Sequence, residues 1–218
     1  MTVCGVDVGS LRTPSAVAWL HDDELSFGAY VPSASRPLPE PPSGVAPACF
    51  ALDAPQGLPV AGEQRRAADR LANTPTRVLP SRREDVQAMR AFGALVDAGV
   101  TIFWEALERG LASLDRHSAA PAIAETYPRF VILTLWPDLR IPSKRKEARR
   151  YVAEVWSRIQ ALGYGADAPP ATHDEVDAAL CALAAEAWQR GAAVEVGLAP
   201  IVDAAGRVLR EGFIVAPA

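Results

Sequence analysis

Short apolar runs separated by polar turns dominate the N-terminal part of the chain. Residues 3–8, 15–20 and 25–31 each have the length and composition of a buried strand, and only short turns connect them. Because short connections join antiparallel neighbours, we expect these three strands to form a meander. A fourth strand is predicted at residues 48–52 and a fifth at residues 121–126, each of them beside an acidic side chain.

Apolar side chains at helical spacing characterise much of the chain after the fourth strand. The segments that we predict as helical are residues 63–71, 84–97, 101–115, 129–136, 143–162 and 172–189. The last helix has the clearest boundaries, because Thr172 can cap it, Glu175 completes a capping box and Gly191 ends it. Residues 213–216 are expected to add a final short strand or extended segment.

This order of elements predicts a mixed α/β fold with one five-stranded sheet flanked by helices. Residues 1–218 can bury one sizeable core, so we expect a single domain with insertions rather than two domains. One insertion is the proline-rich loop at residues 33–47, and the other is the helical segment at residues 60–118.

The composition narrows the class of protein further. No stretch of about 18 residues is free of charged and polar side chains, and the N-terminal residues lack the basic start of a signal peptide. The cysteines Cys4, Cys49 and Cys181 are odd in number and lack zinc-site spacing, so we expect buried thiols and a cytoplasmic protein without a membrane partner. The net charge of −4 argues against a protein that coats long nucleic acid, although a local basic groove is compatible with it.

Five acidic residues occur where strands or a helix would present them to one region of the fold: Asp7, Asp53, Glu125, Asp174 and Asp177. The first lies inside an apolar strand, the next two directly follow apolar runs, and the last two lie three apart near the start of a helix. Ligands of open α/β sheets gather at the carboxyl ends of strands, so these groups converge if the strands are neighbours. Each acid also has a structural alternative, as a turn former, a partner of an arginine, or a helix-end charge favoured by the helix dipole.

A cluster of carboxylates requires a cation, because like charges at close range repel one another. Oxygen ligands suit Mg²⁺ and Mn²⁺, so the metal ligands expected from the sequence are Asp7, Asp53, Asp174 and Asp177. Two such ions about 4 Å apart can stabilise both the attacking and the leaving oxygen of a phosphodiester. We interpret His173 as a helix-end polar residue, with a metal or proton-transfer role as the alternative.

Five short segments of the chain resemble the motifs of a known family. In order they are Gly5-Val6-Asp7, Leu52-Asp53-Ala54-Pro55-Gln56-Gly57-Leu58-Pro59, Glu125-Thr126-Tyr127-Pro128, His173-Asp174-Glu175-Val176-Asp177-Ala178-Ala179 and Glu211-Gly212-Phe213-Ile214-Val215-Ala216-Pro217. Together they resemble the family of domain of unknown function 429, whose members are described as predicted nucleases with a ribonuclease-H fold. The resemblance spans nearly the whole chain and implies a ribonuclease-H-like sheet and a metal-dependent nuclease site.

The arrangement of the acids is also similar to that of Holliday-junction resolvases, which share the ribonuclease-H fold. In those enzymes one acid lies on the first strand, one lies at the end of the fourth, and a pair lies on the last helix. Asp7, Asp53, Asp174 and Asp177 match these positions, whereas Glu125 belongs to the family pattern and is additional to the resolvase pattern. The resemblance therefore implies a catalytic role for all five acids.

Two groups of basic residues could bind the phosphates of a substrate. One lies between the fourth strand and the long helix, and from it we expect Arg65, Arg77, Arg82 and Arg83 to contact substrate. Its remaining members are Arg66, Arg70 and Arg90, and the second group comprises Lys144, Arg145, Lys146, Arg149 and Arg150. The alternative is that both are solvated helix faces, and Lys144, Arg145 and Arg149 with Glu147 have the pattern of an ordinary charged helix surface.

These observations favour a metal-dependent phosphodiester hydrolase that uses Mg²⁺ or Mn²⁺ and acts on nucleic acid or another phosphodiester. One alternative is a non-catalytic nucleic-acid or ligand-binding module that kept the fold. A third is an actin-like phosphotransferase, because Asp7-Val8-Gly9-Ser10 also suits a phosphate-binding hairpin. That fold normally needs a duplicated domain, and no second such loop occurs in the chain.

Overall fold

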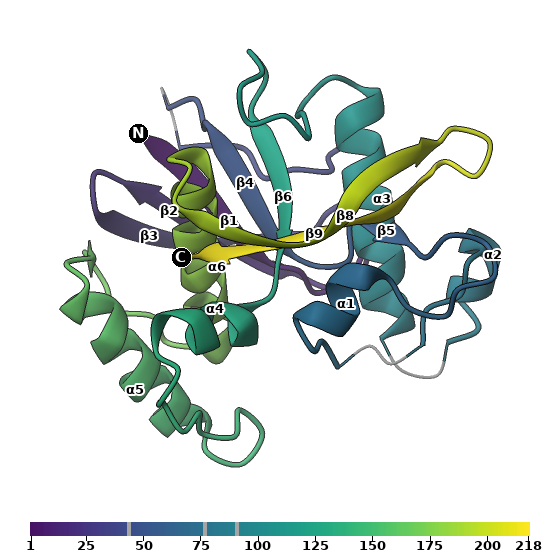
Figure 1. The fold of residues 1–218 in the computed structure, drawn as a ribbon. Coiled ribbons are helices and arrows are strands. Elements are labelled where there is room, and N and C mark those ends of the chain that lie inside the picture. The colour runs from purple at the N-terminus through teal and green to yellow at the C-terminus, as the bar shows by residue number, and fades with distance from the viewer. Residues whose placement is uncertain (43–44, 76–77, 90–91) are drawn as a thin grey trace.

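One twisted sheet forms the centre of the molecule (Figure 1). The computed structural model describes residues 1–42, 45–75, 78–89 and 92–218. The strands are β1 (Thr2–Asp7), β2 (Ser15–His21), β3 (Glu24–Tyr30), β4 (Cys49–Asp53), β5 (Gly57–Leu58), β6 (Ala122–Thr126), β7 (Gly165–Ala166), β8 (Ala193–Asp203) and β9 (Val208–Pro217). The helices are α1 (Ala67–Leu71), α2 (Arg83–Val86), α3 (Gly93–Glu108), α4 (Pro128–Leu135), α5 (Ala148–Ala161) and α6 (His173–Gln189).

The strand order is β5-β9-β6-β4-β1-β2-β3-β7, and β8 pairs with β9 outside this path. The strands β1, β2 and β3 form the predicted antiparallel meander. On the other side of β1, the strands β4, β6 and β9 run parallel to β1 and to one another. The sheet is therefore mixed, as expected, and the carboxyl ends of β1 and β4 lie next to each other.

The expectation of five strands is wrong, because the described part of the chain forms nine. Two of the additional strands, β5 and β7, are only two residues long and follow no alternating pattern. The long strand β8 was not predicted, because much of it is exposed and it therefore lacks the regular apolar alternation of a strand with one buried face. It pairs antiparallel with β9, and the two form a hairpin that extends from the sheet (Figure 1).

Helices cover both faces of the sheet (Figure 1). The helix α6 lies on one face, where its apolar side chains share a core with the inward residues of β1, β2 and β4 and with α4 and α5. The helix α3 contributes to a second core on the opposite face. Side chains alternate between these cores along each strand, so Val3 belongs to the α6 side and Cys4 and Val6 to the α3 side.

Several helix boundaries differ from the predicted ones. The two helices expected at residues 84–97 and 101–115 are instead the short α2 and the continuous α3, which ends at Glu108. The helix expected from residue 143 begins at Ala148, and the preceding segment consists of turns. The capping box at Thr172 and Glu175 is present as predicted, and Gly191 adopts a left-handed φ of 72° just beyond α6.

The described residues of the proline-rich loop form no helix or strand, as expected for that segment. The three cysteines are buried and free, as predicted. Among the residues that the structure describes, no helix has both the length and the apolar character needed to cross a bilayer.

Candidate metal centre

The register of two central strands brings the first two acids together. The strands β1 and β4 run parallel, and Asp7 of β1 is the direct partner of Asp53 of β4. Because side chains alternate along a strand, Asp7 lies on the same side as Val3, which belongs to the core under α6. By the same alternation Asp53 lies on the side of Ala51, so both carboxylates face α6.

Close packing of α6 on β1 supplies the third acid. Gly5 lies under this helix, and a Cβ at that position would come within 2.1 Å of the Ala178 carbonyl oxygen and of the Ala182 backbone nitrogen. The absence of a side chain therefore allows the helix to approach the strand. Asp177 lies on the same part of α6 and is buried.

Asp7, Asp53 and Asp177 each present one carboxylate oxygen, and these three oxygens lie within 4.8 Å of one another. Asp177 is buried, whereas Asp7 and Asp53 are partly accessible to solvent. We call this group the carboxylate triad. The sequence predicted all three residues, although they are far apart in the chain, and the structure brings them into one site.

Asp174 does not belong to the triad, although the sequence predicts it as a metal ligand. Its side chain is 57% exposed, and its Oδ1 atom lies 2.6 Å from Nδ1 of His173. It lies one helical turn before Asp177, at the rim of the site. Its charge helps to raise the pKa of Asp7, although burial, Asp53 and Asp177 contribute more. Asp174 is thus outside the group of three converging carboxylates, and its role as a metal ligand remains a prediction.

Glu125 lies near the triad but faces the other side of the sheet. Its register partner in β4 is Leu52 rather than Asp53, and Leu52 belongs to the core under α3. The two carboxylate oxygens of Glu125 accept hydrogen bonds of 2.6 and 2.7 Å from Arg66, and one of them accepts a further bond from the backbone N–H of Gln56. Arg66 also binds Asp69, and its guanidinium is inaccessible to solvent.

The triad has two polar partners that the sequence did not single out as site residues. The ammonium group of Lys144 contacts Oδ2 of Asp177, and the hydroxyl of Tyr151 donates a hydrogen bond of 2.5 Å to Oδ1. Lys144 belongs to the second basic group, for which the sequence leaves open a phosphate-binding role or an ordinary charged helix surface, and it lies in the turns before α5. The sequence does contain a signal for Tyr151. It lies at helical spacing from Val155 and Ile159, and this spacing marks the buried face of α5.

Burial and mutual repulsion raise the pKa values of the triad. Burial raises the pKa of Asp53 to about 8, with a further contribution from Asp177. Burial and the neighbouring Asp53 hold the pKa of Asp7 well above its ordinary value. Burial also raises the pKa of Asp177, against the lowering effects of Lys144 and Tyr151. The three carboxyl groups therefore lack enough positive charge around them to ionise together.

This deficit of positive charge and the type of donor atom agree with a metal site. Three carboxylate oxygens form a donor set without nitrogen or sulfur, which is suited to hard divalent cations. Partial exposure of Asp7 and Asp53 leaves a path to solvent. The residues present can therefore hold a divalent metal ion.

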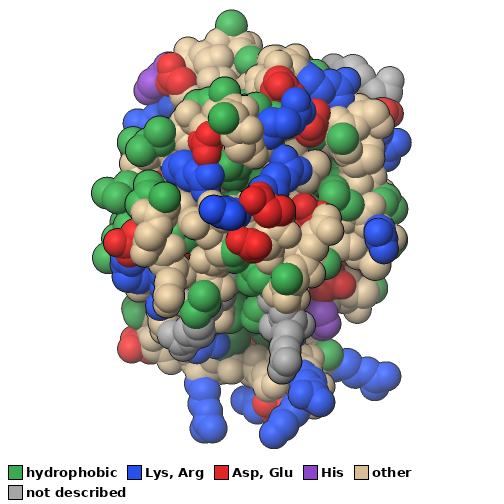
Figure 2. All heavy atoms as spheres, turned by 90° about the vertical axis from the view of Figure 1, so that its right-hand side faces the viewer, with side chains coloured by type: hydrophobic (Ala, Val, Ile, Leu, Met, Phe, Trp, Pro, Cys, Tyr) green, Lys and Arg blue, Asp and Glu red, His purple; other side chains and the backbone are tan. Residues whose placement is uncertain are grey.

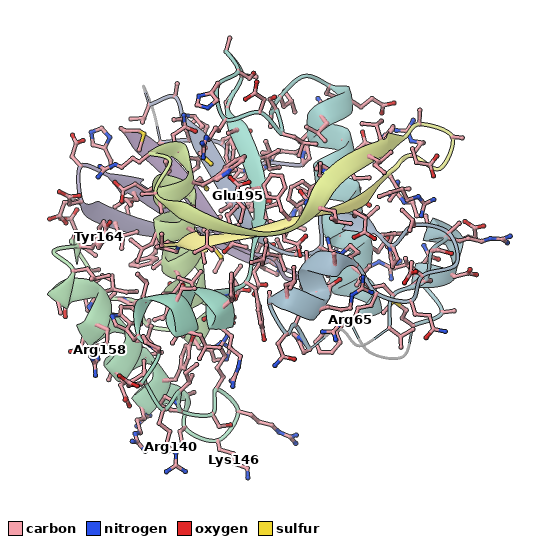
Figure 3. The ribbon with its side chains drawn as sticks, viewed as in Figure 1. Arg65, Arg140, Lys146, Arg158, Tyr164 and Glu195 are labelled. Carbon is pink, nitrogen blue, oxygen red and sulfur yellow. The ribbon has the colours of Figure 1, made fainter. Side chains whose placement is uncertain are left out.

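Two of the arginines from which we expected substrate contacts bind acceptors of the chain itself. Arg65 donates hydrogen bonds of 2.6 and 3.1 Å to two backbone carbonyl oxygens in and just after α1 (Figure 3). Arg83 donates to Thr101 and to the carbonyl oxygen of Arg207. Both guanidinium groups thus bind the chain itself, and their substrate role remains a prediction.

The other two arginines of that prediction are less informative. Arg82 is exposed, and Arg77 lies outside the described residues, as does Arg90 of the same basic group. On the face that carries the β8–β9 hairpin, basic and acidic side chains are interspersed (Figure 2). Ion pairs of this part of the molecule include Arg207 with Glu108 and Arg210 with Asp203.

The mixed sheet, the helix packed on it and the carboxylate triad define a mixed α/β protein with a candidate metal centre. This architecture is consistent with the ribonuclease-H-like class that the sequence motifs resemble. A family model described as a protein of unknown function, DUF429, matches residues 5–200. The chain therefore belongs to the family of domain of unknown function 429. Searches of curated proteins and of solved structures found no match.

Proposed function

We propose that this protein is a metal-dependent phosphodiester hydrolase of the nuclease type. The observation that carries the proposal is the convergence of Asp7, Asp53 and Asp177, whose carboxylate oxygens lie within 4.8 Å of one another at the carboxyl ends of two parallel strands and on a helix. Buried carboxylates that repel one another are costly to the fold, so their presence together favours a function that uses a cation.

The metal in this proposal is Mg²⁺ or Mn²⁺, held by Asp7, Asp53 and Asp177. Such an ion would supply positive charge that stabilises the negative charge developing on the phosphate, and it would lower the pKa of water at the site. In this proposal Asp174 binds the ion through water or orients the nucleophile, and its exposed position one helical turn before Asp177 supports that role. Glu125 supports the site through Arg66, since its carboxylate faces away from the triad.

Lys144 and Tyr151 act on Asp177 in this proposal. The hydroxyl of Tyr151 donates to Oδ1 and fixes the orientation of the carboxylate, while the Lys144 ammonium balances part of its charge. The side chain of Lys144 is 40% exposed, so it can also reach an anionic group that enters from solvent. Together they hold one ligand of the site in place before a cation arrives.

The test is hydrolysis of a chromogenic phosphodiester and of single-stranded, duplex and branched DNA and RNA, with Mn²⁺, with Mg²⁺ and with a chelator. We expect metal-dependent cleavage of at least one substrate. Asp7→Asn should reduce the rate on the order of 100-fold or more, because it removes one of the charged ligands. The matched control is Asp138→Asn, since Asp138 is exposed and outside the triad.

Two results would contradict the proposal. Cleavage by Asp7→Asn at the rate of the parent would assign the activity to a contaminant. Isothermal titration calorimetry that detects no divalent-metal binding by the parent would remove the basis of the mechanism.

The Lys144–Asp177 ion pair favours a second candidate, a binding module that kept the fold without turnover. An ammonium group already neutralises one carboxylate of the triad, as a metal would. If this module is correct, Lys144→Met should leave a protein that binds metal more tightly than the parent and still cleaves no phosphodiester. Cleavage by the parent would exclude it.

The hairpin after β1 gives little support to an actin-like phosphotransferase. The side-chain oxygen of Ser10 accepts hydrogen bonds from the backbone N–H groups of Arg12 and Thr13. A phosphate-binding hairpin directs such backbone N–H groups at its ligand, whereas here they donate to the Ser10 side chain.

A further inference from the structure

A cleft of about 510 Å³ opens beside the carboxylate triad. Tyr127 and Arg129 line it from the start of α4, Lys144 and Arg145 from the turns before α5, and Tyr151 from α5 itself. Lys144 and Arg145 belong to the second basic group of the sequence, for which both phosphate binding and a solvated helix surface were possible. Tyr127 belongs to the Glu125-Thr126-Tyr127-Pro128 motif, whose aromatic residue the metal centre does not use.

The cleft is continuous with the metal centre through shared residues. Lys144 and Tyr151 line the cleft, and both contact the carboxylate of Asp177. Tyr127 lines the cleft and also a smaller cavity of about 130 Å³, which includes Asp53. The triad therefore lies between two hollows, with Tyr127 at their boundary.

The two hollows differ in the charged side chains that line them. Among the described residues, the lining of the larger cleft includes the cations Arg129, Lys144 and Arg145 and no carboxylate. The smaller cavity is lined by Asp53, Asp69 and Glu125, and the buried Arg66 pairs with the last two. An anionic ligand is therefore attracted to the larger cleft, whose lining carries the cations.

Two of the three cations are available to a ligand. Arg129 and Arg145 are exposed, and neither forms an ion pair within the ranges that the structure describes. Other arginines of the molecule bind acceptors of the chain itself, as Arg66 does with Glu125 and Arg207 with Glu108. An unpaired guanidinium beside a cleft is suited to two-point hydrogen bonding with a phosphate.

We propose that this cleft binds single-stranded nucleic acid, with Arg129 and Arg145 on the phosphates next to the bond held at the triad. The inference rests on the proposed function and names its substrate class. A volume of about 510 Å³ has room for one or two nucleotides and is in the range of small-ligand sites, whereas a duplex does not enter a space of this size. The half-buried ring of Tyr127 offers a surface on which a base stacks.

The experiment measures binding separately from cleavage. Fluorescence anisotropy follows a labelled eight-nucleotide DNA and the same RNA sequence with Ca²⁺ in the buffer, and unlabelled duplex and mononucleotide compete with the probe. The double variant Arg129→Ala/Arg145→Ala should bind about tenfold more weakly or worse, because it loses two charge-assisted contacts. For this variant, the slope of log K against the logarithm of the salt concentration should be shallower by about 0.7 for each lost phosphate contact.

The matched control is Arg140→Ala/Arg158→Ala, which removes the same charge. Both arginines are exposed, lie outside the cleft lining and project from the α4–α5 region of the molecule (Figure 3). The control should bind the oligonucleotide as the parent does. Equal weakening in the two double variants would overturn the inference, because it would show that affinity follows net charge alone.

Other outcomes separate this inference from the proposed function. Absence of oligonucleotide binding, or equal competition by duplex, overturns the single-strand cleft even if the protein hydrolyses a small chromogenic phosphodiester. Retention of cleft-dependent binding by Asp7→Asn, together with a parent that cleaves nothing, supports the cleft and rejects the hydrolase.

Discussion

Glu125 and Arg66 form an ion pair that is almost completely withdrawn from water, with side-chain exposures of 4% and 0%. Removing both charges from water carries a large desolvation cost, which the pair offsets through several short hydrogen bonds. The neighbouring carboxylates raise the pKa of Arg66 against the effect of burial, so the guanidinium remains charged. The pair joins the segment before α1 to the end of β6, beside the triad.

We predict that Glu125→Gln lowers the free energy of unfolding by about 3 kcal/mol or more, because it leaves the buried Arg66 with one carboxylate fewer. Urea unfolding followed by circular dichroism measures this loss. The control is Glu63→Gln. Glu63 is exposed, and its Oε2 atom lies 3.7 Å from Nη1 of the exposed Arg70, which makes a weak surface ion pair. This control should change the stability by no more than about 0.5 kcal/mol. A Glu125 variant as stable as the control would show that the pair contributes nothing net.

At the scale of elements, the contact between β1 and α6 determines whether the site exists. The two elements meet at Gly5, where the backbone of the helix takes the space that a side chain would fill. Asp7 lies two residues further along the same face of the strand, and Asp177 lies one residue before Ala178 on the helix. A shift of α6 away from the sheet would therefore separate the carboxylates.

We predict that Gly5→Ala destabilises the protein by about 3 kcal/mol and weakens divalent-metal binding in the same variant, since α6 must move to admit the methyl group. Thermal unfolding and calorimetric metal titration measure the two effects. The control is Gly28→Ala in β3, where a Cβ would have no neighbour within 4 Å. Unchanged metal affinity in a folded Gly5→Ala protein would contradict the role given to this contact.

The sequence predicts the triad well because each acid interrupts an apolar pattern. Asp7 and Asp53 end buried strands, and Asp177 precedes a run of small apolar residues in a helix. The sequence does not show that Glu125 faces the opposite side of the sheet from the triad, because that depends on the register between β4 and β6. Lys144 could not be recognised either, because its turn brings it to Asp177 through tertiary contacts that no local spacing encodes.

At the scale of the whole molecule, the triad links stability to pH. Burial raises the pKa of Asp53 from an ordinary value of 3.8 to about 8 in the folded chain, with Asp177 adding to the effect. The folded state thus binds more protons than the unfolded state between these two values. The contribution of Asp53 to the free energy of unfolding is therefore fully present below its pKa in the unfolded chain. It is lost as the pH rises through its pKa in the folded chain.

We predict that the metal-free protein, kept in a chelator, melts at progressively lower temperature as pH rises from about 5 to about 8.5. Each raised carboxyl group contributes a slope of at most about 1.4 kcal/mol per pH unit. Asp53→Asn should flatten the profile, and Asp138→Asn should not. Differential scanning calorimetry measures the profile, and a melting temperature that rises with pH in this window would contradict the prediction.

The origin of the triad in three separate segments has a consequence for biosynthesis. Asp7 and Asp53 belong to the early strands, but Asp177 lies in α6, which is synthesised after β6, α4 and α5. A nascent chain on the ribosome therefore lacks the third carboxylate until most of the fold has been translated. Whatever chemistry the site performs can therefore begin only after α6 has been synthesised and packed on the sheet.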